Sequence, residues 1–443
     1  MRDLLIMSIV FAAAFAALKR PWIGVMLWTW LSIMNPHRYA FGFAYDAPVA
    51  AIAFGATIIG LIATKERSSP FKGTAVSLFV VFMVWISLST MFGIDPSDDY
   101  WQWNKVMKVD AMILVALMLL HTKKHILALT WISAGSLALL GAKGGLFTLM
   151  TGGNFRVWGP PGSFIEDNNE FALSLVMAIP LLRFLQLQLT NRLGRHAMSA
   201  TMLLCAVASL GSYSRGALLA ISAMALFLWW NGKNKLVVGM VLILAVPLLI
   251  AFMPDAWMGR MSTINDYQED ESSMGRIAAW WNAWNIAFHY PLGVGFNAAR
   301  PELFERFSPY PEMVHAAHSI YFQVLGNHGF VGLFLFLSIW ISTWRSAGWL
   351  RTQCAKIPEA AWCVDMGAMC QVCLLGYAVG GAFLSLAYFD LPYNVMVMVI
   401  LTRVWVQTKG WLREPAYVPG WKNIPGLARP VVPQLAAPIK RYV

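Results

Sequence analysis

Apolar stretches long enough to cross a membrane recur along this chain and restrict what it can fold into. A membrane-spanning helix needs about 20 predominantly apolar residues. The chain supplies such stretches repeatedly, among them residues 47–64, 73–91, 171–189, 216–230, 236–253, 329–344 and 364–388. Only 12% of the residues are charged, about half of the roughly 25% found in soluble domains. The sequence therefore predicts an all-α integral membrane protein with about twelve transmembrane helices.

The basic residues indicate which way the chain lies in the membrane. They cluster in short segments between the apolar stretches: Lys65, Arg67 and Lys72; Lys123 and Lys124; Arg192 and Arg195; Lys233 and Lys235; Arg345 and Arg351. Such loops are cytoplasmic under the positive-inside rule. The formal net charge of +11 is explained by this pattern. Because no basic stretch is interleaved with aromatic residues, we expect membrane lipid as a partner and no nucleic acid.

One long polar interval divides the chain. Residues 254–328 contain four arginines, eight acidic residues and no lysine. Their acidic balance and the basic loops on either side place them outside the cytoplasm. We therefore predict N-terminal transmembrane helices over residues 1–253, a large periplasmic loop containing helices over 254–328, C-terminal transmembrane helices over 329–409, and a cytoplasmic tail over 410–443.

The five cysteines fit a structural role. Cys205, Cys354, Cys363, Cys370 and Cys373 lie mostly in apolar or helix-flanking sequence. Cys370 and Cys373 have the spacing of a redox motif, but they fall inside a predicted membrane helix. We interpret all five as small buried residues and expect no disulfide framework.

An amphipathic helix is predicted within the long loop, over residues 273–289. Its apolar residues follow helical spacing and include three tryptophans: Ile277, Trp280, Trp281, Trp284 and Phe288. Asn282 and Asn285 lie away from this stripe. Such a helix is typical of the membrane surface. Arg276 falls in its first turn, where Ser272 or Ser273 can cap it, so free N–H groups, the helix dipole and a guanidinium would form an anion site. After Pro291, residues 293–297 are predicted to make a tight turn.

A second arginine has a similar setting. Arg215 precedes the apolar stretch 216–230, with Ser214 as its cap. An arginine at the outer end of a membrane helix is costly and indicates a functional role. Arg260, Arg300 and Arg306 are the other loop arginines, and ordinary surface positions explain them equally well.

Two histidines follow near the end of the loop. His315 and His318 are three residues apart, which on a helix would put them on one face. No third ligand stands at a recognisable spacing, so we expect no metal site here. A neutral histidine suits a general base near pH 7.

Taken in order, these pieces resemble the O-antigen ligase and polymerase superfamily of bacterial envelope glycan assembly. The matching pieces are residues 214–217, Arg276 before the tryptophan-rich helix, residues 291–297, and His318 with Ser319, Gly329 and Gly332. The N-terminal third, including residues 28–37, looks like the branch of exosortase-associated O-glycosylation ligases. The resemblance implies a GT-C-like glycosyltransferase that needs neither a metal nor another cofactor.

The resemblance also implies roles for these residues. The donor would be a glycan on undecaprenyl diphosphate and the acceptor the lipid A–core of lipopolysaccharide, at the periplasmic face of a Gram-negative inner membrane. Arg215 and Arg276 would hold the donor diphosphate, and His318 would act as the catalytic base of an inverting transfer. Tyr213, His315, Arg156 and Asn168 would line the cavity; the last belongs to segment 162–170, which a helix cap before Phe171 also explains.

Three alternatives remain open at this stage. The same fold could serve a polysaccharide polymerase or a protein O-oligosaccharyltransferase. A metal-dependent glycosyltransferase could use Asp98 and Asp99, although those residues also fit the start of a helix. A flippase or exporter would explain the many spans, but the sequence shows no pair of similar halves.

Overall fold

The computed structural model describes residues 1–231 and 271–414, together with the isolated positions 236, 240, 253–255, 257 and 259. Within this part of the chain all regular structure is helical. The α-helices are α1 (Arg2–Lys19), α2 (Pro21–Met34), α3 (Val49–Ala63), α4 (Thr74–Met91), α5 (Pro96–Leu119), α6 (Lys123–Met150), α7 (Asn168–Gln188), α8 (Arg192–Gly211), α9 (Arg215–Asn231), α12 (Glu271–His289), α13 (Pro301–Phe307), α14 (Ile320–Gln353), α15 (Ala361–Gly381) and α16 (Asp390–Gln407).

Local sequence sets where several helices begin. The side chain of Asp95 accepts a hydrogen bond from Asp98 N (3.1 Å) just before Pro96 opens α5. Thr122 accepts one from His125 N (3.1 Å) at the start of α6. Such caps satisfy N–H groups that have no partner inside the helix. The two apolar runs at the N-terminus form separate helices because Pro21 stands at the first position of α2.

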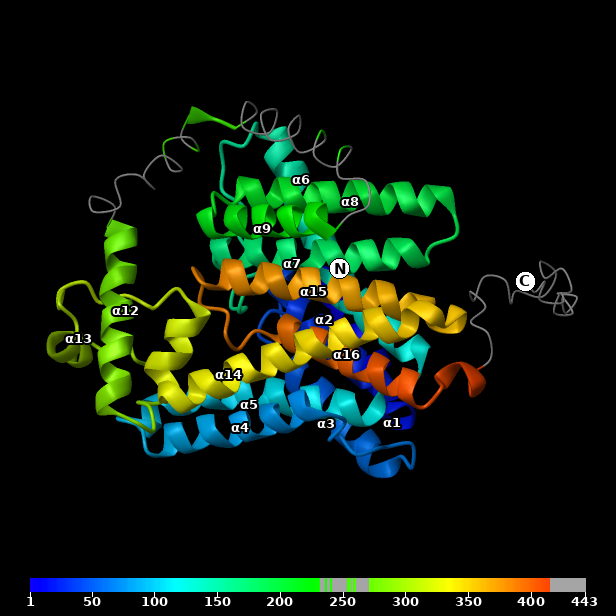
Figure 1. Ribbon diagram of the computed structural model, residues 1–443, viewed down its shortest axis with the longest axis horizontal. Coiled ribbons are helices and arrows are strands. Elements are labelled where there is room, and N and C mark those ends of the chain that lie inside the picture. Colours follow the sequence, from blue (N-terminus) through cyan, green and yellow to red (C-terminus); the bar gives the residue numbers. More distant parts are fainter. Residues whose placement is uncertain are drawn as a thin grey trace, which may run out of the picture.

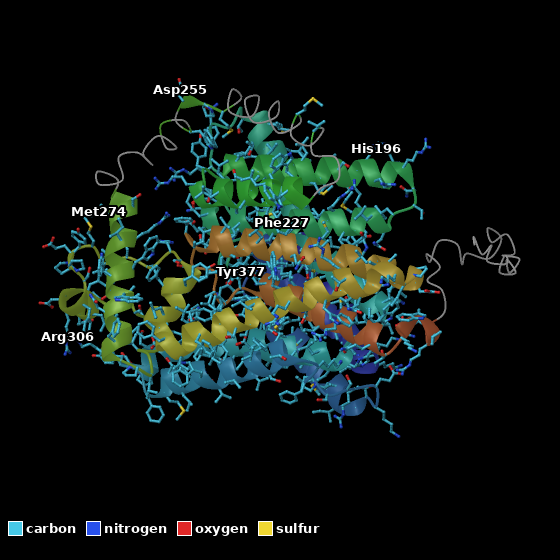
Figure 2. All side chains as sticks on the ribbon, viewed as in Figure 1. His196, Phe227, Asp255, Met274, Arg306 and Tyr377 are labelled. Atoms are coloured by element: carbon cyan, nitrogen blue, oxygen red, sulfur yellow. The ribbon has the colours of Figure 1, made fainter. Side chains whose placement is uncertain are left out.

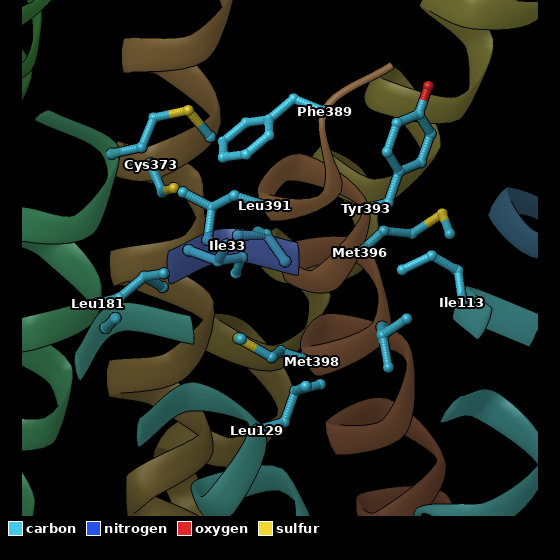
Figure 3. Close-up of a cluster of buried hydrophobic side chains, with 14 of the residues drawn as sticks. Ile33, Ile113, Leu129, Leu181, Cys373, Phe389, Leu391, Tyr393, Met396 and Met398 are labelled. Atoms are coloured by element: carbon cyan, nitrogen blue, oxygen red, sulfur yellow. The ribbon is translucent and has the colours of Figure 1, made fainter. Parts of the chain in front are cut away.

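Helix α16 lies at the centre of the bundle. Residues 390–402 are all buried, and the helix packs against α2, α5, α6, α14 and α15. Figure 3 shows its Leu391, Met396 and Met398 surrounded by Ile33 of α2, Ile113 of α5, Leu129 of α6 and Leu181 of α7. A helix that is apolar on every side is stabilised only where neighbours enclose it. All five cysteines are buried, as predicted.

The bundle has two chemically different ends. At one, Ser68 N donates to Met118 O (3.1 Å) and Lys123 N to Glu414 Oε2 (3.0 Å). We call it the basic end, because the segments 64–73, 120–124 and 189–195 carry the clustered lysines and arginines. We call the opposite end, with residues 92–98, 151–167, 212–214, 290–319 and 382–389, the site end. In Figure 2, His196 of α8 lies toward the basic end, whereas Met274 and Arg306 lie at the site end.

Six helices within the described residues have the length and composition to cross a membrane: Thr74–Met91, Lys123–Met150, Asn168–Gln188, Arg192–Gly211, Ile320–Lys356 and Pro358–Gly381. Three shorter apolar helices accompany them, Pro21–Met34, Val49–Ala63 and Arg215–Trp230. The chain is thus a multi-pass helical membrane protein. The count of about twelve spans stays a prediction, and the stretch 236–253 lies outside the described residues apart from three positions.

Helix α12 does not run with the bundle. It lies across the site end and packs against α14 (Figure 1). The prediction of a helix over residues 273–289 is confirmed, with its start two residues earlier. The prediction that Arg276 lies in the first turn, capped by Ser272 or Ser273, is wrong, because both serines lie inside the helix and Arg276 falls in its second turn. Arg260 lies outside the described residues.

Candidate active site

The polar face of α12 holds the rest of the site-end loop. Asn282 Nδ2 donates to Ala298 O (3.0 Å), and Asn285 Nδ2 donates to Phe307 O (2.8 Å). On another side, the indole of Trp280 donates to Ala317 O (2.8 Å) and stacks on Phe322 at 5.0 Å between ring centroids. The amide and indole groups therefore fix the loop on both flanks of α12.

A break in α14 receives the glycine-containing segment. Gly329 has a φ of 68°, which interrupts the helix, so the apolar stretch predicted from this residue is the second part of a helix that starts at Ile320. Val294 N and Gly295 N both donate to Asn327 O, at 2.9 and 3.1 Å. The predicted tight turn over 293–297 is therefore wrong in register: the turn closes between Tyr290 and Gly293. Gly293 and Gly295, with φ values of 88° and 104°, lead the chain past the break.

His318 lies in a loop immediately before α14. Residues 313–318 have no helical structure, and Ser319 is the residue before the helix. The prediction that His315 and His318 share a helix face is wrong, because the helix starts only at Ile320. His318 instead has a φ of 41°, a left-handed conformation that is uncommon outside glycine. Its side chain is 35% exposed, and its Nδ1 lies 3.9 Å from Glu170 Oε1.

The surroundings of His318 favour its neutral form. Burial lowers the pKa of His318 below its usual 6.5, and the positive charge of Arg276 lowers it further. Asp167 acts in the opposite direction, and His315 adds a smaller lowering effect. The imidazole is therefore unprotonated on one nitrogen at neutral pH, as a general base must be.

Two acidic residues at the start of α7, Asp167 and Glu170, lie close to the His318 ring. We call them the carboxyl pair. Asp167 accepts from Asn169 N (2.8 Å) as the cap of α7. Burial raises the pKa of Asp167, but hydrogen bonds from Glu170 and Asn169 and the charge of His318 together hold it below its usual value. Glu170 is buried, and its Oε1 accepts from Ser385 N (3.4 Å). Asp167 therefore has two contacts: it caps α7, and in that position it and Glu170 lie next to His318.

His315 occupies a different position from His318. Its ring packs over Gly275, where an added Cβ would lie 2.5 Å from His315 Cδ2, and Gly275 precedes Arg276 in α12. His315 lines a cavity of about 160 Å³ together with Asn282, Gln323 and Ser385. His315 therefore packs against α12, whereas His318 lies next to the start of α7.

Arg215 opens α9 as expected, and Ser214 Oγ accepts from Ala217 N (3.2 Å) as the predicted cap. The next residue, Gly216, packs against Phe383: an added Cβ would lie 3.3 Å from Phe383 Cβ. Two residues further along that turn, Ser385 N donates to Glu170. The turn between α15 and α16 therefore links the start of α9 to the carboxyl pair.

The secondary candidates lie around the turn that precedes Arg215. Asn168 Nδ2 donates to Ser212 O (2.6 Å), and Tyr213, which has a φ of 63°, donates its hydroxyl to Gly153 O (2.7 Å). Exposed Arg156 places its guanidinium 5.6 Å from the centre of the Tyr213 ring. These contacts hold the backbone that carries Arg215.

Arg300 gathers three aspartates at the start of α5; we call this group the Arg300 cluster. Its Nη2 lies 3.2 Å from both Asp98 and Asp99, and its Nη1 lies 3.6 Å from Asp95. Asp99 Oδ2 also accepts from Phe296 N (2.9 Å). Among the described residues no group of three or more His, Cys, Asp or Glu is placed to hold a metal ion. Arg306 is exposed and packs over Phe307.

Sequence reasoning did not assign the turn 382–389 or Gln323 to the site. Gln323 Oε1 accepts from Ala387 N (3.3 Å), which fixes that turn against α14. The turn is apolar, and most of it falls inside the stretch 364–388 that was predicted to span the membrane, so its sequence carries no charge pattern to single it out; α15 instead ends at Gly381. The signal for Glu170 was present, since an acidic residue one turn into an apolar helix is costly without a role.

The architecture and site define a helical membrane protein whose candidate base, His318, lies within electrostatic reach of Arg276 at one end of the bundle. Residues 200–337, which include Arg215, Arg276 and His318, match the family described as O-antigen ligase, so this part of the chain is similar to that family. Residues 1–190 match a family of unknown function. No curated protein matches the chain. The family supports a glycosyltransferase-type activity in the assembly of O-antigen or related polysaccharide.

Proposed function

We propose that the protein transfers a glycan from undecaprenyl diphosphate to the lipid A–core of lipopolysaccharide. The observation that carries this proposal is the setting of His318: its pKa is lowered, Arg276 acts on it electrostatically, and its Nδ1 lies 3.9 Å from Glu170. A neutral base beside a guanidinium suits a reaction in which a hydroxyl attacks and an anionic group leaves.

The donor would bind along α12. Arg215 stands at the start of α9, where N–H groups and the helix dipole favour an anion. Arg276 lies in the second turn of α12 and would contribute its guanidinium charge. Next to Arg276, an apolar groove of about 420 Å³ is lined by Ile277, Trp280, Trp281, Trp284 and Phe322. A prenyl chain fits an apolar groove, and a diphosphate fits guanidinium groups. One helix thus offers both parts of a lipid diphosphate a suitable surface.

The chemical step needs one base and one leaving-group site. The acceptor oxygen attacks the anomeric carbon while His318 takes the hydroxyl proton. The bond from that carbon to the diphosphate oxygen breaks, and the oxygen leaves with the electron pair. Arg215 and Arg276 stabilise the charge that develops there. Direct displacement inverts the anomeric centre.

The carboxyl pair supports His318 in this step. With Nδ1 facing Glu170, the proton of the neutral imidazole resides on Nδ1 and Nε2 is left to accept the acceptor's proton. The negative charge of Asp167 then stabilises the imidazolium that forms. These residues position and stabilise the base and do not touch the substrate.

Arginine charge also replaces a catalytic cation in this proposal. The aspartates of the metal-dependent alternative, Asp98 and Asp99, both lie 3.2 Å from Arg300, which neutralises them where a metal would otherwise bind. We expect transfer to continue in excess chelator. Loss of transfer in chelator that magnesium or manganese restores would favour the metal-dependent alternative.

The acceptor is tested directly. Purified protein would be incubated with lipid-linked glycan as donor in three separate reactions. The first would contain lipid A–core, the second a candidate acceptor protein, and the third no acceptor. A mass gain on lipid A–core alone supports the proposal. A mass gain on the protein would instead favour a protein O-oligosaccharyltransferase. Lengthening of the lipid-linked glycan would favour a polymerase. Absence of any product would contradict the proposal and favour a flippase or exporter.

The site end is proposed to face the periplasm of a Gram-negative inner membrane, because the basic end has the charge of cytoplasmic loops. All five native cysteines are buried, so single cysteines can be placed on a quiet background. A cysteine at exposed Glu312 should react with a membrane-impermeant maleimide once the outer membrane is permeabilised, and one at exposed Lys65 should not. The reverse pattern would invert the topology.

A further inference from the structure

A second cavity lies at the site end, away from the residues that match the O-antigen ligase family. It has a volume of about 290 Å³, close to the lower limit of roughly 300 Å³ for small-molecule pockets. The end of α2, the first half of α5 and residues 162–164 form its walls. All of these lie within residues 1–190, for which the matching family has no known function.

Positively charged groups line this cavity. Lys105 and Lys108 both reach it from α5. Neither forms an ion pair with any residue that the structure describes. The acids that act electrostatically on Lys105 are Asp390 and Glu166. Each already accepts a hydrogen bond, Asp390 from Ser32 Oγ (2.6 Å) and Glu166 from Gly162 N (2.8 Å). His37 also lines the cavity, and its buried Nδ1 has no hydrogen-bond partner in the described part of the chain. These groups would favour a ligand that carries negative charge.

Aromatic rings complete the walls. Trp28, Trp101 and Phe164 line the cavity, and Lys105 Nζ lies 4.0 Å from the centre of the Phe164 ring and 5.3 Å from that of Trp101. Asn35 and Asn104 add amide groups. Flat apolar faces suit the C–H surfaces of a sugar ring, while amides suit its hydroxyl groups. The combination of rings, amides and cations fits a saccharide with negative charge better than a lipid chain or a bare anion.

The wall of the cavity continues to the candidate active site. Phe164 lines the cavity, and Glu170, six residues later, lies beside His318. Six residues span at most about 20 Å, so one oligosaccharide can occupy both places. The segment between them is fixed, because Gly159 N donates to Glu166 O (2.9 Å) and Asp167 caps α7.

We propose that this cavity binds an anionic saccharide and that, on the proposed function, it holds the charged inner sugars of the acceptor while the acceptor hydroxyl reaches His318. The charged saccharide could belong to a membrane-anchored glycolipid or to a free glycan, and both offer the same groups. The two regions of the chain would then bind different substrates. Residues 200–337 would bind the donor and supply the base, and residues 1–190 would bind the acceptor.

The test measures binding and does not depend on turnover. Full-length protein in lipid nanodiscs would bind fluorescent lipid A–core in the absence of donor. Glucose 1-phosphate, glucuronate, uncharged glucose and inorganic phosphate would serve as competitors. In the wild type, the two charged sugars should compete at concentrations at least about tenfold lower than glucose or phosphate. Equal competition by glucose, or by phosphate alone, would overturn the saccharide assignment.

Matched variants locate the binding. Lys108→Ala and Trp101→Ala each change an exposed side chain of the cavity, so both should fold, and each should weaken lipid A–core binding about tenfold. Lys108→Ala should also abolish the preference for charged sugars, and Lys108→Arg should keep it. Arg306→Ala, which removes an exposed cation elsewhere at the site end, should bind as the wild type does. Unchanged binding in both cavity variants would refute the proposal.

Failure of this inference and of the proposed function would differ. His318→Ala should abolish transfer but keep acceptor binding, whereas Lys108→Ala should keep donor binding. If only the free charged sugars bind at the cavity and lipid A–core does not, the acceptor role is wrong although the cavity still takes an anionic saccharide. If lipid A–core binds through Lys108 but is never glycosylated, the cavity assignment stands and the transfer assignment falls.

Discussion

Two charged groups at the site end use the same residue types for different purposes. In the Arg300 cluster, one guanidinium lies within 3.6 Å of three aspartates, and its side chain is only 14% exposed. His318 interacts electrostatically with one arginine, one other histidine and the carboxyl pair, but it remains 35% exposed and its nearest acidic oxygen is 3.9 Å away. Short ion-pair contacts largely bury Arg300, whereas the imidazole of His318 stays partly accessible.

The difference suits a structural role for the Arg300 cluster and the proposed catalytic role for the group around His318. Arg300 joins α5 to the loop, because Asp99 also accepts from Phe296 N. Arg300 belongs to the same loop as Arg276, and three aspartates surround it. Arg276 acts electrostatically on His318 and lowers its pKa. Variants in both groups can test whether the two arginines have different roles.

The largest effect is expected for His318→Ala. If His318 is the base, transfer should fall by about 10² to 10⁴-fold, which is typical of general-base loss. Donor binding should survive, since the arginines remain. His315→Ala should have a milder effect, because that ring lines a cavity and packs over Gly275. Turnover and donor affinity would be measured on purified protein. Normal transfer by the His318 variant, or loss of its donor binding, would show that His318 is not the base.

Arg276→Ala and Arg215→Ala should follow, each lowering transfer by about 10² to 10³-fold, as for loss of one group that stabilises transition-state charge. Lysine at either position should restore only part of the activity, because a point charge loses the bidentate fork. Arg306→Ala provides the control of an exposed loop arginine. Both alanine variants should keep the melting temperature of the wild type; if both also turn over normally, the diphosphate assignment is wrong.

Arg300→Ala should behave in the opposite way. Removing the guanidinium leaves Asp99, which is almost fully buried, without its ionic partner, and loss of one partner of a buried pair costs on the order of 3 kcal/mol. The more exposed contacts with Asp95 and Asp98 add little. The melting temperature should therefore drop, while the donor affinity of the folded fraction stays unchanged. A variant of normal stability that fails to bind donor would place Arg300 in the site and erase the contrast with Arg276.

The sequence predicted individual helices and caps better than the contacts between helices that are distant in the chain. The helix over residues 273–289 and the Ser214 cap followed from apolar periodicity and capping chemistry, and both are confirmed. The paired histidines on one helix were wrong because the start of α14 depends on contacts with α12, such as Trp280 Nε1 to Ala317 O. The link between Glu170 and Ser385 spans 215 positions, and no local pattern encodes such a contact. The roles of His318, Arg215 and Arg276 stay predictions.

The smallest expected effect concerns the charge behind His318. Asp167 raises the pKa of His318, whereas burial and Arg276 lower it, so that the net pKa lies below 6.5. A base must be neutral, so transfer should fall as the pH drops through this lowered value. Asp167→Asn keeps a residue that caps helices well but removes the negative charge. The pKa of His318 should then fall further, which moves the acid limb of the pH–rate profile to lower pH.

The plateau rate of the Asp167→Asn enzyme should also decline by less than about tenfold, because the imidazolium that forms during transfer loses a stabilising charge. Glu312→Gln, which changes an exposed acid of the same end, is the control and should leave the profile in place. The profile distinguishes this role from a purely structural one, since damage to the fold would lower the rate at every pH without moving the limb. An acid limb that stays in place, or moves to higher pH, would show that Asp167 does not act on the base.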